Sequence, residues 1–313
     1  MYGITLGTDV PLAVNLPPSD VEADLTFALS ASAPDDVDFE AHQPTYTEGE
    51  QSDGRPEFTF WALPDRDVIR ITGAMDFHCW PDRIACHLHA AAHRSLVETA
   101  LFGMVLSLWL ERIGTPTLHG SAVVIGPAAV AFLGSRGTGK TSTAAACVAA
   151  GHPLLSDDLL ALQERDGAVM VMPAYPQLRM WPAQARHFFG TDEGFEPVDA
   201  HRTKLRVPVG HGVGTFSYEP AILRRVYLPF RGTGPETAVD ITSIRPREAV
   251  MALIRESFLR SEVVRYGLQG DRLRFFATLL ADIPVSTIRV PEGLEELPRV
   301  VAAIEADVGG GSA

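Results

Sequence analysis

The segment Gly134 to Thr141, read GSRGTGKT, matches the spacing G-x-x-x-x-G-K-[ST] and constrains this chain more than any other feature. An apolar run, Val130 to Leu133, precedes the segment, and an Ala-rich stretch that favours a helix follows it. Glycines in this pattern let backbone amides turn towards phosphate oxygens, while the lysine reaches the β- and γ-phosphates and the threonine hydroxyl binds magnesium. The pattern therefore predicts a phosphate-binding loop between a strand and a helix. The residues predicted to bind the nucleotide are Gly134, Ser135, Arg136, Gly137, Thr138, Gly139, Lys140, Thr141 and Ser142.

Composition narrows the classes of partner. The 313 residues are 46% hydrophobic, which predicts an ordered globular protein of one large domain or two smaller ones. A net charge of -13 repels the phosphates of DNA and RNA, so no nucleic-acid partner is expected. The three cysteines are too few and too scattered for a disulfide scaffold, and the longest apolar run, Ala100 to Leu110, is too short to span a bilayer. With no signal peptide visible at Met1, we expect a cytoplasmic protein with no membrane partner.

Strand-like and helical patterns divide the chain. Short strand-like runs within residues 1–95 predict a smaller β-rich N-terminal region of unknown role. Residues 96–305 are expected to form the catalytic domain, and residues 306–313, which end in GGGSA, a flexible tail. A helix is predicted over Ser95 to Ile113, followed by a hairpin of Leu118 to Ile125 and Ala129 to Leu133 around Gly126-Pro127. Further predicted elements are helices at Lys140–Ala150, Pro246–Arg260 and Leu294–Ile304, and strands at Leu154–Leu162, Ala168–Met172 and Val285–Val290.

A second chemical signal is the acidic pair Asp157-Asp158 within LLSDDLLAL. The number of residues between Lys140 and Asp157 is enough for a helix and a short return to the next strand. If that strand is parallel and the crossover right-handed, its carboxyl end lies beside the glycine loop. Adjacent strand residues point to opposite sides, so one carboxylate can bind Mg²⁺ while the other accepts a proton from an attacking hydroxyl. The alternative is a solvated Asp-Asp turn, which the flanking leucines disfavour.

Three basic or titratable side chains extend this candidate site. If Ile125 pairs with Ala129 across the hairpin turn, His119 lies opposite Ser135, where it can hold a carboxylate or touch phosphate; a structural histidine is the alternative. Lys204 and Arg206 are candidates for clamping a phosphate or an acidic substrate, and a solvated basic strand explains them equally well.

The histidines and cysteines in and near the N-terminal region are not expected to form a metal site. Their spacing fits no standard zinc pattern, and alternating positions on a strand do not enclose an ion. The residues concerned are His78, Cys79, Cys86, His87, His89 and His93. Asp35 to Glu57, which is rich in acids, is expected to be an exposed loop.

The strings LHGSAVVIG, GSRGTGKTS and HPLLSDDLLAL, taken in this order, resemble the catalytic domain of the bacterial HPr kinase family. The likeness covers about residues 96–300 and is strongest over residues 118–162. YPQLRMWP and IPVSTIRVPEGLEELP are more similar to HPr-kinase-related proteins, including those found beside peptide-modification genes. The resemblance implies an α/β fold with a P-loop and a mixed central sheet flanked by helices.

The resemblance also implies roles for the site residues. Lys140 and Thr141 would serve ATP and Mg²⁺, and His119 with Asp157 and Asp158 would carry out phosphoryl transfer. We favour Asp157 as the base, with Thr141 and Asp158 at the metal. The downstream glycine-rich signature of HPr kinase is missing, and residues 1–95 do not resemble its N-terminal domain, so neither HPr as substrate nor a reverse reaction is implied.

The sequence and this resemblance together predict an ATP- and Mg²⁺-dependent kinase acting on a serine-type hydroxyl of a peptide or protein. A ribosomal natural-product precursor is the first candidate acceptor, and only the resemblance implies it. One alternative is a kinase of free serine or another metabolite using the same site. Another is a nucleotide-sensing regulatory protein without transfer activity. A GTPase is less favoured because Asn-Lys-x-Asp is absent from the sequence. Homo-oligomerisation stays open.

Overall fold

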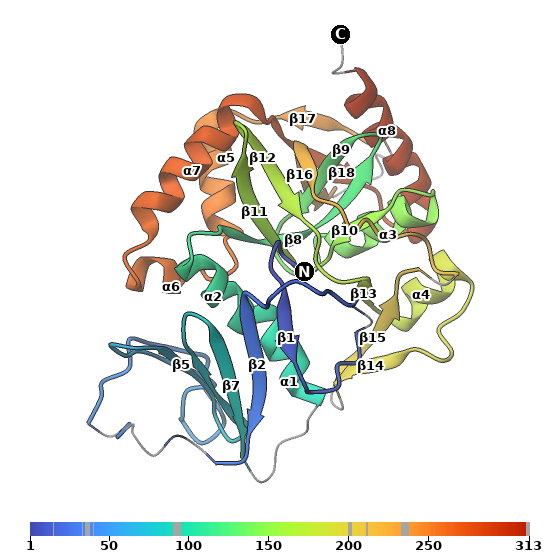
Figure 1. The fold of residues 1–313 in the computed structure, drawn as a ribbon. Helices are drawn as coiled ribbons and strands as arrows, with labels where there is room; N and C mark the ends of the chain where they lie inside the picture. The colour runs from blue at the N-terminus through green and yellow to red at the C-terminus, as the bar shows by residue number, and fades with distance from the viewer. Residues whose placement is uncertain are drawn as a thin grey trace.

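The computed structural model describes residues 1–14, 16–32, 34, 38–39, 41–89, 95–199, 202–210, 212–232 and 238–310. It has a mixed α/β architecture in which an N-terminal sheet and a larger central sheet lie on either side of a short helical rod (Figure 1). The mixed central sheet that the sequence predicts is confirmed. In the described ranges, no helix is both long enough and apolar enough to cross a bilayer.

The N-terminal sheet has the strand order β1-β2-β7-β6-β5-β4-β3 among the described residues. β1, β2 and β7 run parallel, and the remaining neighbours are antiparallel. One face packs against the helical rod through an apolar cluster that includes Phe27, Phe77 and Leu101. The bounds are β1 Leu6–Thr8, β2 Leu25–Ser30, β3 Tyr46–Glu48, β4 Phe58–Ala62, β5 Asp67–Ile71, β6 Met75–Cys79 and β7 Arg83–Leu88.

The rod confirms the helix predicted from Ser95 onwards. It comprises α1 (Ser95–Ala100), a π-helical turn η1 (Leu101–Val105) and α2 (Leu106–Arg112). Gly114, with φ of 85°, follows its end. Its apolar cluster continues into the central sheet at Leu159 and Ala161, so the N-terminal sheet shares one core with the rest of the chain.

The central sheet is organised around β8, which is antiparallel to β9, β10 and β11. β16 runs parallel to β9 and β18, while β12 joins β11 to β16 in antiparallel pairs and β17 adds to β18. The bounds are β8 Thr117–Ile125, β9 Ala128–Leu133, β10 Leu154–Ser156, β11 Leu159–Arg165, β12 Ala168–Met172, β16 Ala221–Arg231, β17 Ile241–Ser243 and β18 Val285–Val290.

Alternation along β9 gives the central sheet two apolar faces. Val130 and Phe132 pack with α3 (Lys140–Ala149) and α8 (Leu297–Gly310), and Ala129 and Leu133 pack with α5 (Pro246–Arg255) and α7 (Gln269–Asp282). Burial on both faces explains why this strand is apolar throughout.

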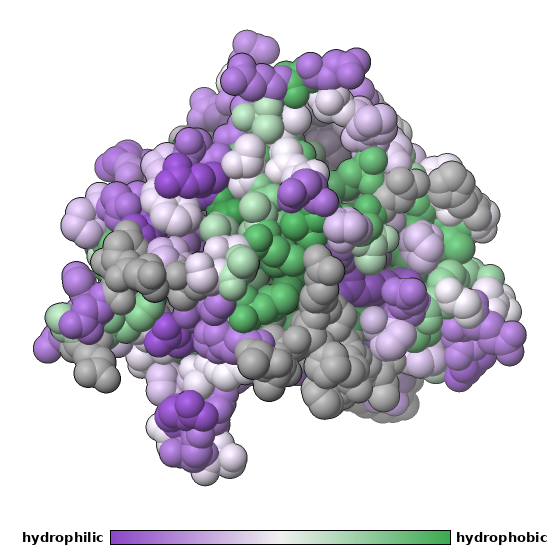
Figure 2. All heavy atoms as spheres, turned by 60° about the horizontal axis from the view of Figure 1, so that its bottom comes forward, coloured by the Kyte–Doolittle hydropathy of each residue, from purple (hydrophilic) through white to green (hydrophobic). Residues whose placement is uncertain are grey.

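A smaller sheet, β13-β15-β14, lies beside α4. Figure 2 turns the bottom of Figure 1 towards the viewer. On this face, apolar side chains gather at the centre and polar side chains at the margins. The remaining bounds are β13 Gln177–Met180, α4 Pro182–Phe189, β14 Glu196–Asp199, β15 Arg202–Pro208, α6 Arg260–Arg265 and the 3-10 turn η2 Leu294–Glu296.

Two predicted segments differ from the structure. The helix expected over Pro246–Arg260 stops at Arg255, because Phe258 N donates to Thr117 O and the chain follows the edge of β8 instead. The tail expected from residue 306 is helical as far as Gly310, since Asp307 accepts hydrogen bonds from Tyr227 and Arg225. Residues 311–313 of that tail lie outside the described residues.

A buried ion pair ties the rod to the start of β8. The Glu111 carboxylate accepts hydrogen bonds from Thr117 N at 2.7 Å and Thr117 Oγ1 at 2.6 Å, and it pairs with Arg272 of α7. The side chains of Glu111 and Arg272 are 3% and 5% exposed. Neither charge is therefore compensated by solvent.

We expect Glu111→Ala to lower the free energy of unfolding by about 3–5 kcal/mol, because the Arg272 guanidinium would stay buried without its counter-charge. Urea unfolding followed by circular dichroism measures the loss. The double variant Glu111→Leu/Arg272→Met removes both charges and should recover much of it. A single variant with the wild-type midpoint would contradict the expectation.

Candidate functional site

The glycine loop leaves β9 at Leu133 and enters α3 at Lys140, as the pattern predicts. Gly139, the residue before the helix, has φ of 106°, a conformation that L side chains rarely adopt. Thr138 closes the loop by donating from its hydroxyl to Ser135 O at 2.9 Å. The loop therefore presents the first amides and the positive end of α3 at the edge of the central sheet.

Lys140 lies against this loop and is largely buried. Its ammonium donates to Gly134 O at 2.5 Å and to Ser135 O at 3.1 Å. Burial lowers the pKa of Lys140, although Glu256 and the two aspartates oppose that shift. Of the other predicted loop residues, Arg136 is exposed, and the Ser142 hydroxyl is bonded to Gln184 of α4 at 2.6 Å.

The acidic pair lies in an irregular bend between β10 and β11. Both strands pair with β8, at Leu154 with Val123 and at Leu159 with His119. The strand before the acidic pair is not a direct neighbour of the loop strand, because β8 lies between β10 and β9 and is antiparallel to each of them. Since β8 is antiparallel to both β9 and β10, these two strands run in the same direction. β10 therefore ends at the edge of the central sheet where the glycine loop begins.

Asp157 connects this bend to the glycine loop. Its Oδ1 accepts hydrogen bonds from Ser121 Oγ at 2.6 Å and Thr141 Oγ1 at 3.2 Å, and its Oδ2 accepts from Arg179 N at 3.0 Å. Burial, and secondarily the charge of Asp158, raise the pKa of Asp157. This carboxylate thus touches the hydroxyl that the loop pattern assigns to magnesium.

Asp158 turns the other way. Its φ of 77° is left-handed, which Asp tolerates better than most residues. Its carboxylate contacts Arg179 Nη1 at 2.9 Å and His119 Nδ1 at 3.7 Å, and its carbonyl contacts His119 Nδ1 at 3.0 Å. Burial opposes ionisation, but the charges of Arg179 and His119 prevail and hold the pKa of Asp158 below its usual range.

His119 is close to the loop, although not by the predicted register. The hairpin pairs Ile125 with Ala128, one residue short of the expected Ala129. The two-residue turn Gly126-Pro127, with Gly126 at φ of 59°, sets this register. His119 still lines the same cleft as Ser135.

Arg179 is a site residue that the sequence reasoning missed. It lies on β13, where it contacts both aspartates and donates from Nη2 to Tyr175 OH at 3.0 Å. Tyr175 in turn packs edge-on against the fully buried Tyr2, with ring centroids 6.4 Å apart. The signal in the sequence was a lone arginine within the apolar stretch QLRM of YPQLRMWP.

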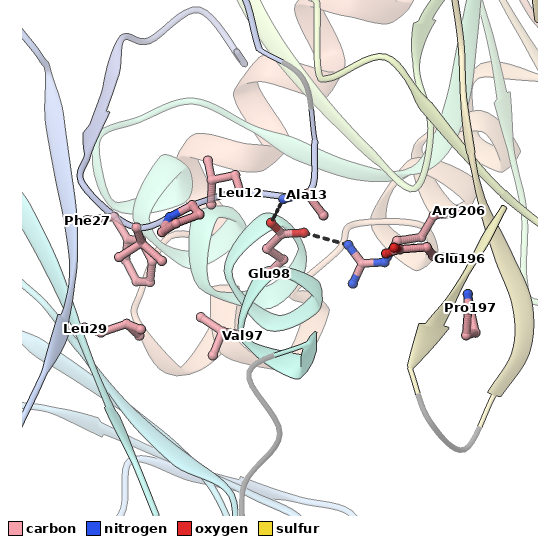
Figure 3. A pocket seen from close by; sticks show the side chains of 11 residues that line it. Leu12, Ala13, Phe27, Leu29, Val97, Glu98, Glu196, Pro197 and Arg206 are labelled. Atoms are coloured by element: carbon pink, nitrogen blue, oxygen red, sulfur yellow. Dashed lines mark hydrogen bonds and ion pairs between the residues drawn. The ribbon is translucent and has the colours of Figure 1, made fainter. Parts of the chain in front are cut away.

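The two predicted basic residues separate. Lys204 is half-buried, and its charge acts on Asp157, Asp158 and Lys140. Arg206 instead forms a buried ion pair with Glu98 of α1 at 2.6 Å and donates to Val198 O at 3.0 Å. Figure 3 shows this pair at a separate cavity of about 300 Å³, where Glu98 also accepts from Ala13 N.

An open cleft of about 420 Å³ adjoins His119 and the loop. Its walls come from β3, the π-turn and the segment between α5 and α6. The volume lies within the usual range for ligand sites. The lining residues are Glu48, Met104, His119, Ser135, Arg255, Glu256, Ser257, Phe258, Leu259, Arg260 and Ser261.

The histidines and cysteines near the N-terminus do not converge on an ion. Cys79 and Cys86 lie in the apolar cluster, where burial raises the pKa of both thiols, and His89 pairs with Asp76 at 3.4 Å. Over the part of the chain that the structure describes, no group of three or more His, Cys, Asp or Glu could hold a metal. His93, and part of the expected acidic loop, lie outside that part.

No protein-family model and no curated protein sequence matches the chain. Among solved structures, the HPr(Ser) kinase/phosphatase from Coxiella burnetii is similar with a TM-score of 0.32 and 15% identity, over 62% of this chain and 94% of that one.

Gly120, between His119 and Ser121, permits the close contact of β8 and β9 beside the loop. A methyl carbon there would lie 2.5 Å from Leu133 Cδ2 and 2.6 Å from Phe132 O. We expect Gly120→Ala to destabilise the protein by about 1–3 kcal/mol and to weaken nucleotide binding, because β9 must shift where the loop begins.

Thermal unfolding and titration with a fluorescent ATP analogue measure these two effects. Gly103→Ala is the control, since its new carbon would meet only Phe258 Cζ at 3.7 Å. Equal behaviour of the two variants would show that Gly120 is not needed for this contact.

Proposed function

We propose that the chain binds ATP with Mg²⁺ and transfers the γ-phosphoryl group to a serine-type hydroxyl of a peptide or protein. One observation carries the proposal: Asp157 is bonded to Thr141 of the glycine loop, while the adjacent Asp158 is directed to His119 beside the open cleft. Two neighbouring carboxylates thereby serve two different sides of one site.

The loop side suits a triphosphate and its metal. The amides at the start of α3 and the Lys140 ammonium supply positive partners for phosphate oxygens. Thr141 Oγ1 and the Asp157 carboxylate are hard oxygen donors of the kind that Mg²⁺ prefers, with phosphates completing its coordination. When bound, Mg²⁺ would neutralise charge that develops on the phosphates.

The cleft side suits the acceptor. Asp158, held ionised by Arg179 and oriented by His119, takes the proton of the acceptor hydroxyl. The hydroxyl oxygen then forms a bond to the γ-phosphorus, the bond to the bridging oxygen breaks, and ADP leaves. This division assigns Asp158 to the base and Asp157 to the metal, the reverse of the division favoured from the sequence.

The openness of the cleft supports a peptide or protein acceptor over a small metabolite. Glu48 of the N-terminal sheet and Met104 of the rod contribute to its walls, so the lining comes from several separate parts of the chain, a breadth that suits an extended acceptor. A ribosomal natural-product precursor remains the acceptor to test first. A metabolite kinase and a nucleotide sensor remain the alternatives.

We expect Asp158→Asn to reduce phosphate transfer from γ-labelled ATP by about 10²–10⁴-fold while nucleotide affinity is kept, because only proton removal is lost. Asparagine also tolerates the left-handed backbone at this position. Lys140→Ala should weaken nucleotide binding as well. Full transfer by Asp158→Asn would exclude it as the base, and transfer to free serine alone would favour the metabolite kinase.

The ion pair between Arg179 and Asp158 predicts how kcat/KM depends on pH. Its charge lowers the pKa of Asp158, so Arg179→Gln should raise that pKa and move the acidic limb of kcat/KM to higher pH, with activity lost as Asp158 becomes protonated. Arg179→Lys keeps a charge, so its acidic limb should lie nearer that of the wild type. Arg224→Gln, at an exposed position of β16, should leave the profile unchanged. An unmoved limb in Arg179→Gln would contradict this role.

A further inference from the structure

Two arginines, Arg255 and Arg260, line the open cleft. Arg255 ends α5 and Arg260 begins α6, and both side chains are exposed. Within the described residues, neither side chain forms an ion pair or a hydrogen bond, although the chain as a whole carries a net charge of -13. Two guanidinium groups thus lie at the cleft of a chain that is acidic overall.

The segment between these arginines is hydrogen-bonded to β8, the strand that carries His119. Glu256 O accepts from His119 N at 2.7 Å, and Phe258 N donates to Thr117 O at 3.2 Å. The Phe258 ring meets the His119 ring edge-on, with centroids 5.7 Å apart. Since His119 also contacts Asp158, both arginines are held at a set position relative to the proposed base.

The two acidic residues that line the cleft, Glu48 and Glu256, form no ion pair with Arg255 or Arg260 within the described residues. Glu256 also lines the cleft, but it is only 8% exposed and its charge acts on Lys140 of the loop. Glu48 is exposed on β3 and belongs to the wall from the N-terminal sheet. The wall that carries Phe258 is therefore positive at both ends.

We infer that Arg255 and Arg260 bind a carboxylate that neighbours the acceptor hydroxyl, so that the protein selects acidic peptides. Guanidinium groups match carboxylates in shape and charge, and they keep their charge over the physiological pH range. The inference rests on the proposed function, because it assigns the acceptor side of the same site. The carboxylate is supplied either by an Asp or Glu side chain or by the C-terminus of the peptide.

Steady-state transfer to matched peptides tests this selectivity. In one pair of peptides, the residue after the acceptor serine is Asp or Asn. In a second pair, the peptide ends at the serine with a free or an amidated C-terminus. For whichever carboxylate is used, Arg255→Gln and Arg260→Gln should each raise KM about two- to fivefold and together about tenfold, with kcat unchanged. KM for the Asn and amidated peptides should not respond, and the pair that does respond identifies the source.

Two further variants separate local recognition from overall charge. Arg247→Gln removes the same charge from an exposed position of α5 outside the cleft and should leave KM unchanged. Glu48→Gln removes a negative charge from the opposite wall and should lower KM for the acidic peptide. An equal rise in KM for acidic and neutral peptides in the double arginine variant would overturn the inference.

Binding without transfer distinguishes this inference from the kinase proposal. Fluorescence anisotropy of the labelled acidic peptides, with a non-hydrolysable ATP analogue present, compares the full wild-type chain with the double arginine variant. Weaker binding by the variant supports the inference even if no phosphate moves, in which case the kinase proposal fails alone. Equal binding by both proteins would overturn the inference.

Discussion

The site depends on the hydrogen bonds that the buried Asp157 carboxylate accepts from Ser121, Thr141 and the backbone of Arg179. These donors belong to β8, α3 and β13, so one side chain joins the main sheet, the loop helix and the small sheet. Burying a carboxylate is unfavourable unless donors replace its water, and here hydroxyl and amide groups do so. The same burial fixes the position of Thr141 relative to the bend.

This constraint explains how two adjacent acids come to differ. The left-handed backbone at Asp158 directs its carboxylate away from the loop, towards Arg179 and His119. Asp157 has a raised pKa among neutral donors, and Asp158 a lowered one beside a guanidinium. Neighbouring groups with opposite shifts are a common arrangement where acid, base and metal roles are divided. The N-terminus reaches this site as well, because Tyr2 packs on Tyr175, which holds Arg179.

Much of the architecture follows from local patterns. The strand, loop and helix around Lys140 are in the predicted order, the helix from Ser95 is confirmed, and the strand predicted over Leu154–Leu162 exists apart from its bend at the aspartates. The errors arose where tertiary contacts decide. Contact with β8 ends the helix before Glu256, and hydrogen bonds at Asp307 keep the chain helical as far as Gly310, where a tail was expected.

The sequence by itself determined the glycine loop between β9 and α3, because the positive φ of Gly139 and the spacing to Lys140 are encoded in consecutive residues. It also determined that an acidic pair would follow close to the end of the next strand. Only the tertiary structure decided that β8 separates that strand from β9, that Arg179 arrives from another sheet, and that Arg206 pairs with Glu98 instead of facing the site. Contacts between sheets are set by packing between segments that are distant in the sequence. The spacing of neighbouring residues cannot predict such contacts.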